Sequence, residues 1–354
     1  MSSNNIVKIG FVGVGNMGQC AHLRNYPTVE GCQVVALSEL RPNTAKRVAE
    51  KYGIPKVYSD YRDMLAGETL DGIVAPQPFT RHGILVPELL EAGLPVFTEK
   101  PLSSSLASGR KIVDAVDASG AWMMIGYHKR SDPAGMYARA EVDRLKGTGE
   151  LGKLTYIRSL MPAGDWVANG FIDLVREVET AELPKLESEP PDSDMDDETS
   201  AAYRTFVNYY IHQVNLLRYF LGEAYRPTYA DPSGVLFAGE SDSGVPVTIE
   251  MTPYRTTIDW QEHVLICFEK GWVRVDLPAP LASNRPGAVT IYRDPDGETP
   301  QTTIPQLPWV HAMRQQAMNF VAAVRGERAP MCTAHDALRD LEVARAYIRL
   351  KMGK

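Results

Sequence analysis

The sequence has few cysteines, and their spacing excludes the sites that cysteines usually build. The four residues, Cys20, Cys32, Cys267 and Cys332, lie far apart and form no C-x-x-C pair and no mixed cysteine and histidine ligand spacing. Neither a disulfide framework nor a structural zinc site is therefore expected. Free thiols fit a reducing compartment, so we expect a cytoplasmic protein.

A long apolar run and an excess of positive charge are also missing. The first apolar run, residues 6–14, is too short and too glycine-rich to span a membrane, and no basic region or cleavage site surrounds it. The formal net charge is −7. Nucleic acids and anionic membrane surfaces attract positive proteins, so neither is expected as a partner. A small-molecule substrate fits this composition better.

Short apolar runs alternate with helical patterns over the first third of the chain. A chain of 354 residues has room for two domains of roughly 120 to 230 residues. Continuous apolar strands alternating with helices indicate a parallel sheet covered on both faces, so we expect a doubly wound α/β Rossmann domain over residues 1–126. The expected strands are 7–12, 33–37, 72–75, 95–98 and 122–125, and the expected helices are 17–25, 43–52, 87–92 and 106–119.

After residue 126 the pattern changes to longer strands in which apolar and polar residues alternate. This change predicts a second domain over residues 127–354, of the α+β class with a largely antiparallel open sheet. Lys270 and Gly271 join two of its strands as a hairpin. The expected strands are 154–160, 246–252, 263–269 and 272–277, and the expected helices are 201–221 and 334–350.

Residues 183–200 contain a proline pair and a cluster of acidic side chains. This composition is too polar to pack a core. A calcium loop is one alternative, but the glycine and the terminal glutamate of an EF-hand are absent. We therefore expect a solvated loop here and no metal site in the protein.

A glycine-rich turn follows the first expected strand. In VGVGNMG, Gly13, Gly15 and Gly18 form the pattern G-x-G-x-x-G between an apolar strand and a helix. The first glycine permits a tight turn, the second lets the backbone approach a pyrophosphate, and the third allows close packing of helix on strand. The helix N-terminus supplies N–H donors to the anion, so Asn16 and Met17 belong to the predicted dinucleotide site.

Glu39 ends the second expected strand, where a carboxylate accepts hydrogen bonds from the adenosine ribose. A carboxylate at this point repels a 2′-phosphate, so the sequence favours NAD over NADP. Arg41 lies two residues further on and softens that repulsion, which leaves NADP as a second possibility. A solvated charge at the end of a strand is the simpler alternative for Glu39.

The run Thr98-Glu99-Lys100-Pro101 closes another expected strand. In a Rossmann sheet the carboxyl ends of the strands face the ligand crevice, so Lys100 is expected to point at the cofactor. The run EAGLPVFTEKPL contains this motif, GYHKRSDP stands at the domain junction, and the helix NYYIHQVN follows later.

With the glycine turn, these motifs resemble the signature of the glucose-fructose oxidoreductase / inositol dehydrogenase (Gfo/Idh/MocA) family over nearly the whole chain. The resemblance implies that Lys100 contacts the nicotinamide ribose and the substrate hydroxyl, and that the Lys100–Pro101 bond is cis. It also implies that Pro78, His82 and Glu99 lie at the cofactor. The second domain would then bind substrate and assemble a homodimer or homotetramer.

The helix expected over residues 201–221 carries Asn208, His212 and Asn215 on one polar face. This face resembles the family's D-x-x-x-H-x-x-D helix, in which the histidine exchanges protons. The resemblance therefore makes His212 a catalytic and substrate-binding residue, with Asn208 beside it. Asn208 and Asn215 stand where aspartates are common, which puts the usual carboxylate-assisted proton relay in doubt.

Two further side chains are predicted to contact substrate. His128 follows the junction Gly126-Tyr127, and Trp166 precedes the acidic stretch and offers an apolar ring to the apolar face of a sugar. The remaining histidines that we assign to structural or surface positions are His22, His263, His311 and His335.

The sequence thus predicts an NAD(P)-dependent oxidoreductase that transfers hydride between nicotinamide and a secondary hydroxyl of a sugar, sugar derivative or cyclic polyol. One alternative is an enzyme that retains NAD and uses transient oxidation to cleave a glycoside or to epimerise a sugar. The other is a non-enzymatic regulator that senses NAD. Retention of Glu99, Lys100 and His212 argues against the regulator.

Overall fold

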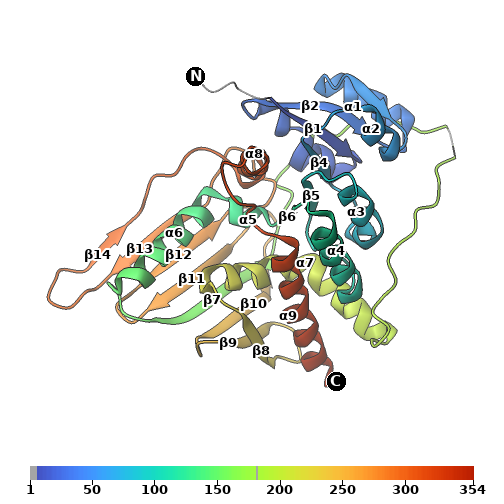
Figure 1. Cartoon of the computed structure of the whole chain (residues 1–354). Coiled ribbons are helices and arrows are strands. Elements are labelled where there is room, and N and C mark those ends of the chain that lie inside the picture. Colours follow the sequence, from blue (N-terminus) through green and yellow to red (C-terminus); the bar gives the residue numbers. More distant parts are fainter. Residues whose placement is uncertain (1–5, 181) are drawn as a thin grey trace. The chain divides into compact units, whose positions relative to one another are not determined.

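The computed structural model describes residues 6–180 and 182–354, and the chain divides into two compact units (Figure 1). The first unit contains Met1–Gly126, Asn169–Ser193 and Gln316–Leu338, and the second contains Tyr127–Ala168, Asp194–Gln315 and Arg339–Lys354. The predicted boundary after residue 126 coincides with the first division. The division expected from the sequence differs from these units because it places Asn169–Ser193 and Gln316–Leu338 in the second domain.

The first unit is built on a six-stranded parallel sheet with the strand order β3-β2-β1-β4-β5-β6. Its strand order changes direction at β1, and this switch point is where open α/β sheets bind ligands. The strands are β1 (Val7–Val12), β2 (Cys32–Ser38), β3 (Lys56–Tyr58), β4 (Gly72–Ala75), β5 (Val96–Glu99) and β6 (Met123–Gly126).

Helices and helical turns connect these strands, and buried apolar side chains form the core around the sheet. Phe320 is fully buried in this core although it comes from near the end of the chain, and its ring contacts those of Tyr26, Phe97 and Trp122. The connections are the π-helix η1 (Gly18–Leu23), the 3-10 turns η2 (Tyr26–Thr28) and η3 (Phe79–Arg81), and α1 (Pro42–Tyr52), α2 (Tyr61–Gly67), α3 (His82–Leu90) and α4 (Leu106–Ser119).

The second unit contains an eight-stranded sheet with the order β14-β13-β12-β11-β7-β10-β9-β8. Only the pair formed by β7 and β10 is parallel among these described strands. The strands are β7 (Leu154–Ala163), β8 (Tyr225–Ala230), β9 (Leu236–Ser241), β10 (Pro246–Arg255), β11 (Glu262–Phe268), β12 (Gly271–Leu277), β13 (Ala288–Arg293) and β14 (Gln301–Thr303). The predicted fold class, a doubly wound parallel sheet followed by an α+β domain with a largely antiparallel sheet, is confirmed.

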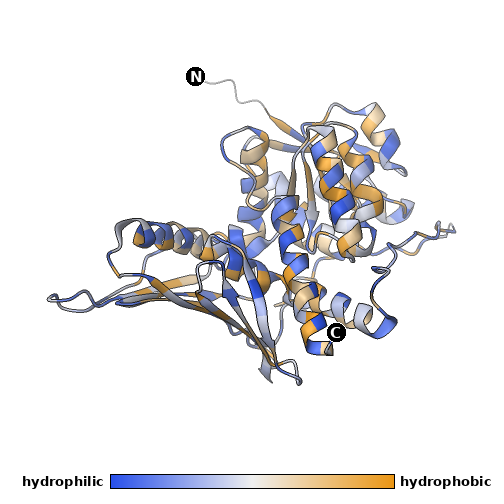
Figure 2. Ribbon diagram, turned by 60° about the horizontal axis from the view of Figure 1, so that its bottom comes forward, coloured by the Kyte–Doolittle hydropathy of each residue, from blue (hydrophilic) through white to orange (hydrophobic). Residues whose placement is uncertain are grey.

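The alternation of buried and half-buried side chains along β11 reflects a sheet that is covered by helices on one face. Successive residues of Glu262–Phe268 are buried and half-buried in turn, and helices of the unit pack on the buried face. The helices mix hydrophobic and hydrophilic residues along their length (Figure 2). They are α5 (His128–Ser131), α6 (Pro133–Thr148) and α7 (Asp197–Leu221), followed by α8 (Ala312–Val324) and α9 (Ala334–Met352), which each span a division between the units.

The expectation of a solvated loop over residues 183–200 is wrong in part. Glu189 and Asp192 are only 4% and 6% exposed. The Asp192 carboxylate accepts hydrogen bonds from the backbone N–H groups of Leu106 and Ala107 in the first turn of α4. Acidic side chains are buried here because the N-terminus of a helix offers donors that match a carboxylate. The last residues of the stretch, from Asp197, begin α7.

The described part of the chain was searched for membrane-spanning helices and for groups of metal ligands, neither of which the sequence predicts. No helix there combines the length and the apolar composition that a membrane crossing requires. The same residues contain no group of three or more histidine, cysteine, aspartate or glutamate side chains arranged to hold a metal ion.

Asp132 is a buried carboxyl group of the second unit whose ionisation should affect the stability of the protein. Its Oδ1 accepts hydrogen bonds from the backbone N–H groups of Ala134 and Gly287, whereas no described residue donates to its buried Oδ2. Burial raises the pKa of Asp132 from 3.8 to about 6, since it penalises the ionised form. The wild-type protein should therefore lose stability as pH rises from about 4 to about 6, where the unfolded chain ionises before the folded one.

Asp132→Asn should remove this penalty while keeping the accepting oxygen. At pH 7 we expect the variant to be more stable than wild type by about 2 kcal/mol, and the difference should vanish below about pH 4. Chemical denaturation of both proteins across this pH range provides the measurement. An equal stability difference at pH 4 and pH 7 would show that ionisation of Asp132 is not responsible.

Candidate functional site

A cavity of about 460 Å³ lies in the first unit at the carboxyl ends of its central strands. Gly13, Gly15, Glu39 and Pro78 line it, so four residues predicted to bind the dinucleotide share one cavity. They come from the loops that follow β1, β2 and β4. This is the edge at which a parallel sheet presents its ligand crevice.

The glycine turn leaves room for an anion at Gly15. Gly13 has a φ of +88°, and a Cβ there would lie 2.0 Å from Nε2 of Gln77. At Gly15, by contrast, a Cβ would meet no atom within 4 Å, so the backbone borders open space. Gly18 packs closely against the turn, with the Gly13 carbonyl oxygen 3.1 Å from its ideal Cβ position. Asn16 and Met17 start the helical segment before η1. The turn therefore fits a pyrophosphate group.

Glu39 is held at the rim of the cavity by the glycine turn and by Arg41. Its Oε2 accepts a hydrogen bond of 2.9 Å from the Val14 N–H, and both carboxylate oxygens accept from the Arg41 guanidinium. Burial raises the pKa of Glu39, but these hydrogen bonds outweigh burial and hold the pKa below its ordinary value. Glu39 is thus ionised near neutral pH, and it is not the solvated charge that was the simpler alternative.

Lys100 directly follows β5, and the Lys100–Pro101 peptide bond is cis, as the resemblance implies. The neighbouring Glu99 is 9% exposed and accepts a hydrogen bond of 2.6 Å from Nε2 of His22. Burial raises the pKa of Glu99, but His22 and Lys100 hold it below its ordinary value. His22, which the sequence assigns to a structural or surface position, is thus buried beside a carboxylate partner.

His82 lies behind the wall of the cavity. It is fully buried, and its ring nitrogens lie 3.1 to 3.2 Å from the carbonyl oxygens of Gln77, Pro101 and Leu102. Burial lowers the pKa of His82, so the neutral ring is favoured. His82 thus contacts the loop that follows Lys100 and is not itself among the described residues that line the cavity.

His212 lies in the second unit within a group of three rings. Its centroid is 4.6 Å from that of His128 and 5.7 Å from that of Tyr127, and both contacts are edge-on. His212 and His128 are only 7% and 4% exposed. The structure therefore brings together the two histidines that were predicted to contact substrate.

A buried ion pair joins the helices that carry these histidines. Lys129 of α5 pairs with Glu262 of β11, and Gln213 of α7 donates a hydrogen bond of 2.6 Å to the same carboxylate. Burial lowers the pKa of Lys129, and Glu262 opposes that shift. Lys129 and Gln213 each directly follow a histidine of the ring group, so the pair fixes the spacing of His128 and His212. The sequence reading missed this pair because its members lie far apart along the chain.

Asn208 and Asn215 occupy different environments although both lie on α7. Asn208 is exposed, one helical turn before His212. Asn215 is 1% exposed, accepts a hydrogen bond from Arg130 and donates one of 2.6 Å to Asp340. Asp340 also pairs with Arg218. Asn215 is therefore a buried member of a hydrogen-bonded network with Arg130 and Asp340.

Trp166 is 37% exposed, and its carbonyl oxygen accepts a hydrogen bond from the Leu281 N–H.

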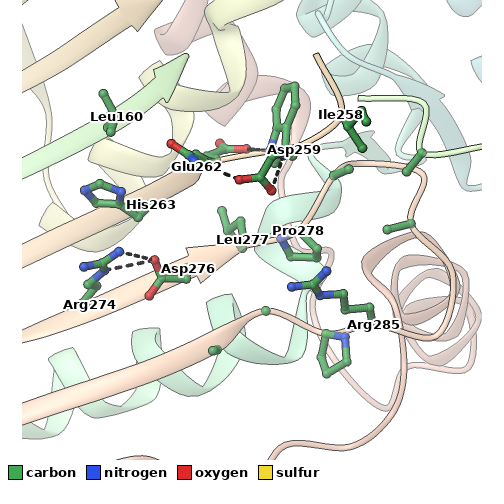
Figure 3. A pocket seen from close by; sticks show the side chains of 18 of the residues that line it. Leu160, Ile258, Asp259, Glu262, His263, Arg274, Asp276, Leu277, Pro278 and Arg285 are labelled. Atoms are coloured by element: carbon green, nitrogen blue, oxygen red, sulfur yellow. Dashed lines mark hydrogen bonds and ion pairs between the residues drawn. The ribbon is translucent and has the colours of Figure 1, made fainter. Parts of the chain in front are cut away.

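A second cavity, of about 540 Å³, lies at the ends of β11 and β12. Figure 3 shows side chains that line this second cavity, among them Arg274, which forms an ion pair with Asp276. His128, Trp166, Asn208 and His212 are not among the described residues that line this cavity.

Comparison with known proteins supports the same assignment for the first unit. Residues 7–127 match the model of the GFO_IDH_MocA oxidoreductase family, described as having an NAD-binding Rossmann fold. The chain is 23% identical to an uncharacterised oxidoreductase, YrbE, of Bacillus subtilis over 95% of its own length and 92% of the relative. It is 33% identical to an inositol 2-dehydrogenase of Acidothermus cellulolyticus, but over only 40% of this chain and 42% of that protein.

The fold of the whole chain also resembles that of solved structures. One is an oxidoreductase of Agrobacterium radiobacter in complex with NAD+, L-tartaric acid and magnesium, which superposes with a TM-score of 0.69 and covers 99% of this chain and 97% of that one. At 15% identity this likeness shows a shared fold.

Proposed function

From the match of residues 7–127 to the Gfo/Idh/MocA family model, we propose that the chain is an oxidoreductase of this family. In this proposal it transfers a hydride between NAD(P) and a secondary hydroxyl carbon of a sugar, sugar derivative or cyclic polyol. The observation that carries the proposal is the cavity in which the glycine turn and Glu39 face the same space. That combination suits a dinucleotide, whose pyrophosphate needs backbone donors and whose ribose needs an acceptor.

The bound nicotinamide supplies the hydride acceptor or donor. In the proposed reaction the Lys100 ammonium donates a hydrogen bond to the substrate oxygen and stabilises the negative charge that develops there. His212 takes the hydroxyl proton during oxidation and returns it during reduction. His128 and Trp166 are proposed to bind the substrate, and Asn208 to orient His212. His22, through Glu99, and His82 would keep the segment around Lys100 in place.

Absorbance at 340 nm tests the proposal. The protein with NAD+ or NADP+ and a panel of inositols and aldoses should accumulate reduced cofactor with at least one of them. Conversion of a substrate without a lasting change at 340 nm would favour glycoside cleavage or epimerisation by transient oxidation. Cofactor binding without conversion of any sugar or polyol would favour the regulator.

We predict that NAD(H) binds more tightly than NADP(H), because the ionised Glu39 repels a 2′-phosphate. Glu39→Gln should reduce this preference by about tenfold, since it removes the charge and frees the Arg41 guanidinium. Fluorescence titration of wild type and variant with NADH and NADPH gives the four dissociation constants. Arg41→Gln serves as the opposite control and should weaken NADPH alone. Tighter binding of NADPH by the wild type would contradict the role assigned to Glu39.

We also propose a cytoplasmic location and a homodimer or homotetramer. The cysteines Cys20, Cys32, Cys267 and Cys332 are all free thiols, which suits a reducing compartment. The assembly is the one that the family resemblance implies for the second domain. Size-exclusion chromatography with light scattering measures it directly.

A further inference from the structure

A segment between β7 and α7 belongs by its contacts to the first unit. It comprises residues 169–193, described except for residue 181, and we call it the strap. Its described residues form no strand, and the chain before and after it belongs to the second unit. Figure 1 shows it as the long yellow-green trace beside the helices of the first unit. An irregular segment of this length inside a compact protein is unusual and commonly has a function.

The first half of the strap is attached at two points. Gln19 exchanges two hydrogen bonds with the backbone of Val175, of 3.0 Å to its carbonyl oxygen and 2.8 Å from its N–H. Four residues later, the Glu179 carboxylate accepts from the N–H groups of Asn43 and Thr44 at the start of α1 and from the Thr44 hydroxyl. Gln19 and α1 flank the glycine turn and Glu39 in the sequence, so these anchors lie beside the predicted cofactor site.

The second half is attached on the other side of the cavity. The Glu189 carboxylate accepts hydrogen bonds from the Gly83 N–H at the start of α3 and from the N–H and hydroxyl of Ser104. The carbonyl oxygen of Glu187 accepts one of 3.2 Å from Nε of Arg81. Arg81 itself lines the cavity. The part of the strap that lines the cavity, residues 183–186, therefore lies between two anchored points.

Three side chains of this central part face the cavity. Leu183, Pro184 and Leu186 line the same space as Gly13, Gly15 and Glu39. Leu183 and Leu186 are 39% and 42% exposed, a high value for leucines that belong to a wall. Apolar surface left open inside a cavity is stabilised by a ligand that covers it.

From this arrangement we infer that Leu183, Pro184 and Leu186 are cofactor-binding residues that pack on the adenosine half of NAD(P). The inference rests on the proposed function, since it concerns the same cavity. Adenine has two apolar faces and suits an aliphatic wall. In this proposal the glycine turn holds the pyrophosphate and Glu39 the adenosine ribose, so the adenine lies beyond Glu39 in the same cavity, whose lining also includes Arg81. Leu183, Pro184 and Leu186 supply the aliphatic side chains of this lining.

The test is the affinity of the double variant Leu183→Ala/Leu186→Ala for NADH and for ADP-ribose, which lacks the nicotinamide, measured by titration calorimetry. Both dissociation constants should rise by about 10- to 100-fold, because apolar contact is lost from each leucine. Ile172→Ala is the matched control, since Ile172 lies on the strap, is 74% exposed and does not line the cavity. It should bind both ligands within about twofold of wild type.

Trypsin cleavage of the wild type provides a second test that needs no variant. Lys185 is exposed between Pro184 and Leu186, so saturating ADP-ribose should slow cleavage after Lys185 by about tenfold or more. Unchanged ADP-ribose affinity in the double variant, or unchanged cleavage after Lys185, would overturn the inference while leaving the proposed function intact. If the wild type binds neither NADH nor NADPH, the proposed function fails and the inference fails with it.

Discussion

Lys100→Met is expected to lower kcat by about 10²- to 10³-fold while NADH still binds. The substitution removes a positive charge from the oxygen on which negative charge develops, and interactions of this kind are typically worth that much in rate. Steady-state kinetics at 340 nm with the best substrate of the panel gives the effect. Because methionine retains most of the length and volume of lysine, the loop before Pro101 should keep its conformation.

Lys111→Met provides the matched control for this result. Lys111 lies on α4, is exposed, and undergoes the same change in charge. Its kcat should stay within about twofold of wild type. A Lys100→Met enzyme that works within about threefold of wild type would remove Lys100 from the mechanism.

His212→Ala is expected to lower kcat by roughly 10²- to 10⁴-fold, the usual range for loss of a general acid–base group. The rings of Tyr127 and His128 pack on His212, so part of the effect could come from repacking. His212→Gln fills more of the space without accepting a proton at neutral pH, and it should show a similar loss. Circular dichroism and NADH affinity establish that both variants are folded.

The exposed Asn208 allows the role of His212 to be examined by pH. A carboxylate one helical turn before the histidine favours the imidazolium, whereas an amide orients the ring without adding charge. Asn208→Asp should therefore move the acidic limb of the kcat profile to higher pH. If the limb stays in place, or if His212→Ala retains nearly full activity, the proton passes through another group, with Lys100, Tyr209 and Tyr210 as the next candidates.

Elements with a strong local pattern were predicted to within a few residues. Continuous apolar runs and the glycine turn identify β1 and η1, and alternation identifies the hairpin of β11 and β12. The helix expected over residues 87–92 begins too late, although a proline start fits the preference of proline for the first turn of a helix. In the structure Pro87 lies inside His82–Leu90. The short β3 and α2 were missed because neither is long enough to show a period.

Hydrogen-bond and ion-pair partners that lie far apart along the chain cannot be predicted from local sequence patterns. His22 and Glu99 are separated by 77 residues, and Lys129 and Glu262 by 133. Nothing in the residues around His22 indicates that a carboxylate will reach it. The composition of residues 183–200 predicts a solvated loop, yet Glu189 is buried because Gly83 and Ser104 donate hydrogen bonds to its carboxylate. A cluster of charged residues predicts an exposed segment only when no N–H or O–H donors from distant parts of the chain bind and bury those side chains.

The first unit is assembled from three separate stretches of chain, and this has a consequence for the order of events during synthesis. When the ribosome has made residues 1–126, the sheet strands exist but Phe320 does not, and the rings of Phe97 and Trp122 have no partner at its position. The first unit therefore cannot complete its core until residue 320 has been made, whereas a domain built from one continuous stretch can fold as it emerges. A nascent chain halted near residue 300 should still be sensitive to protease throughout its N-terminal third.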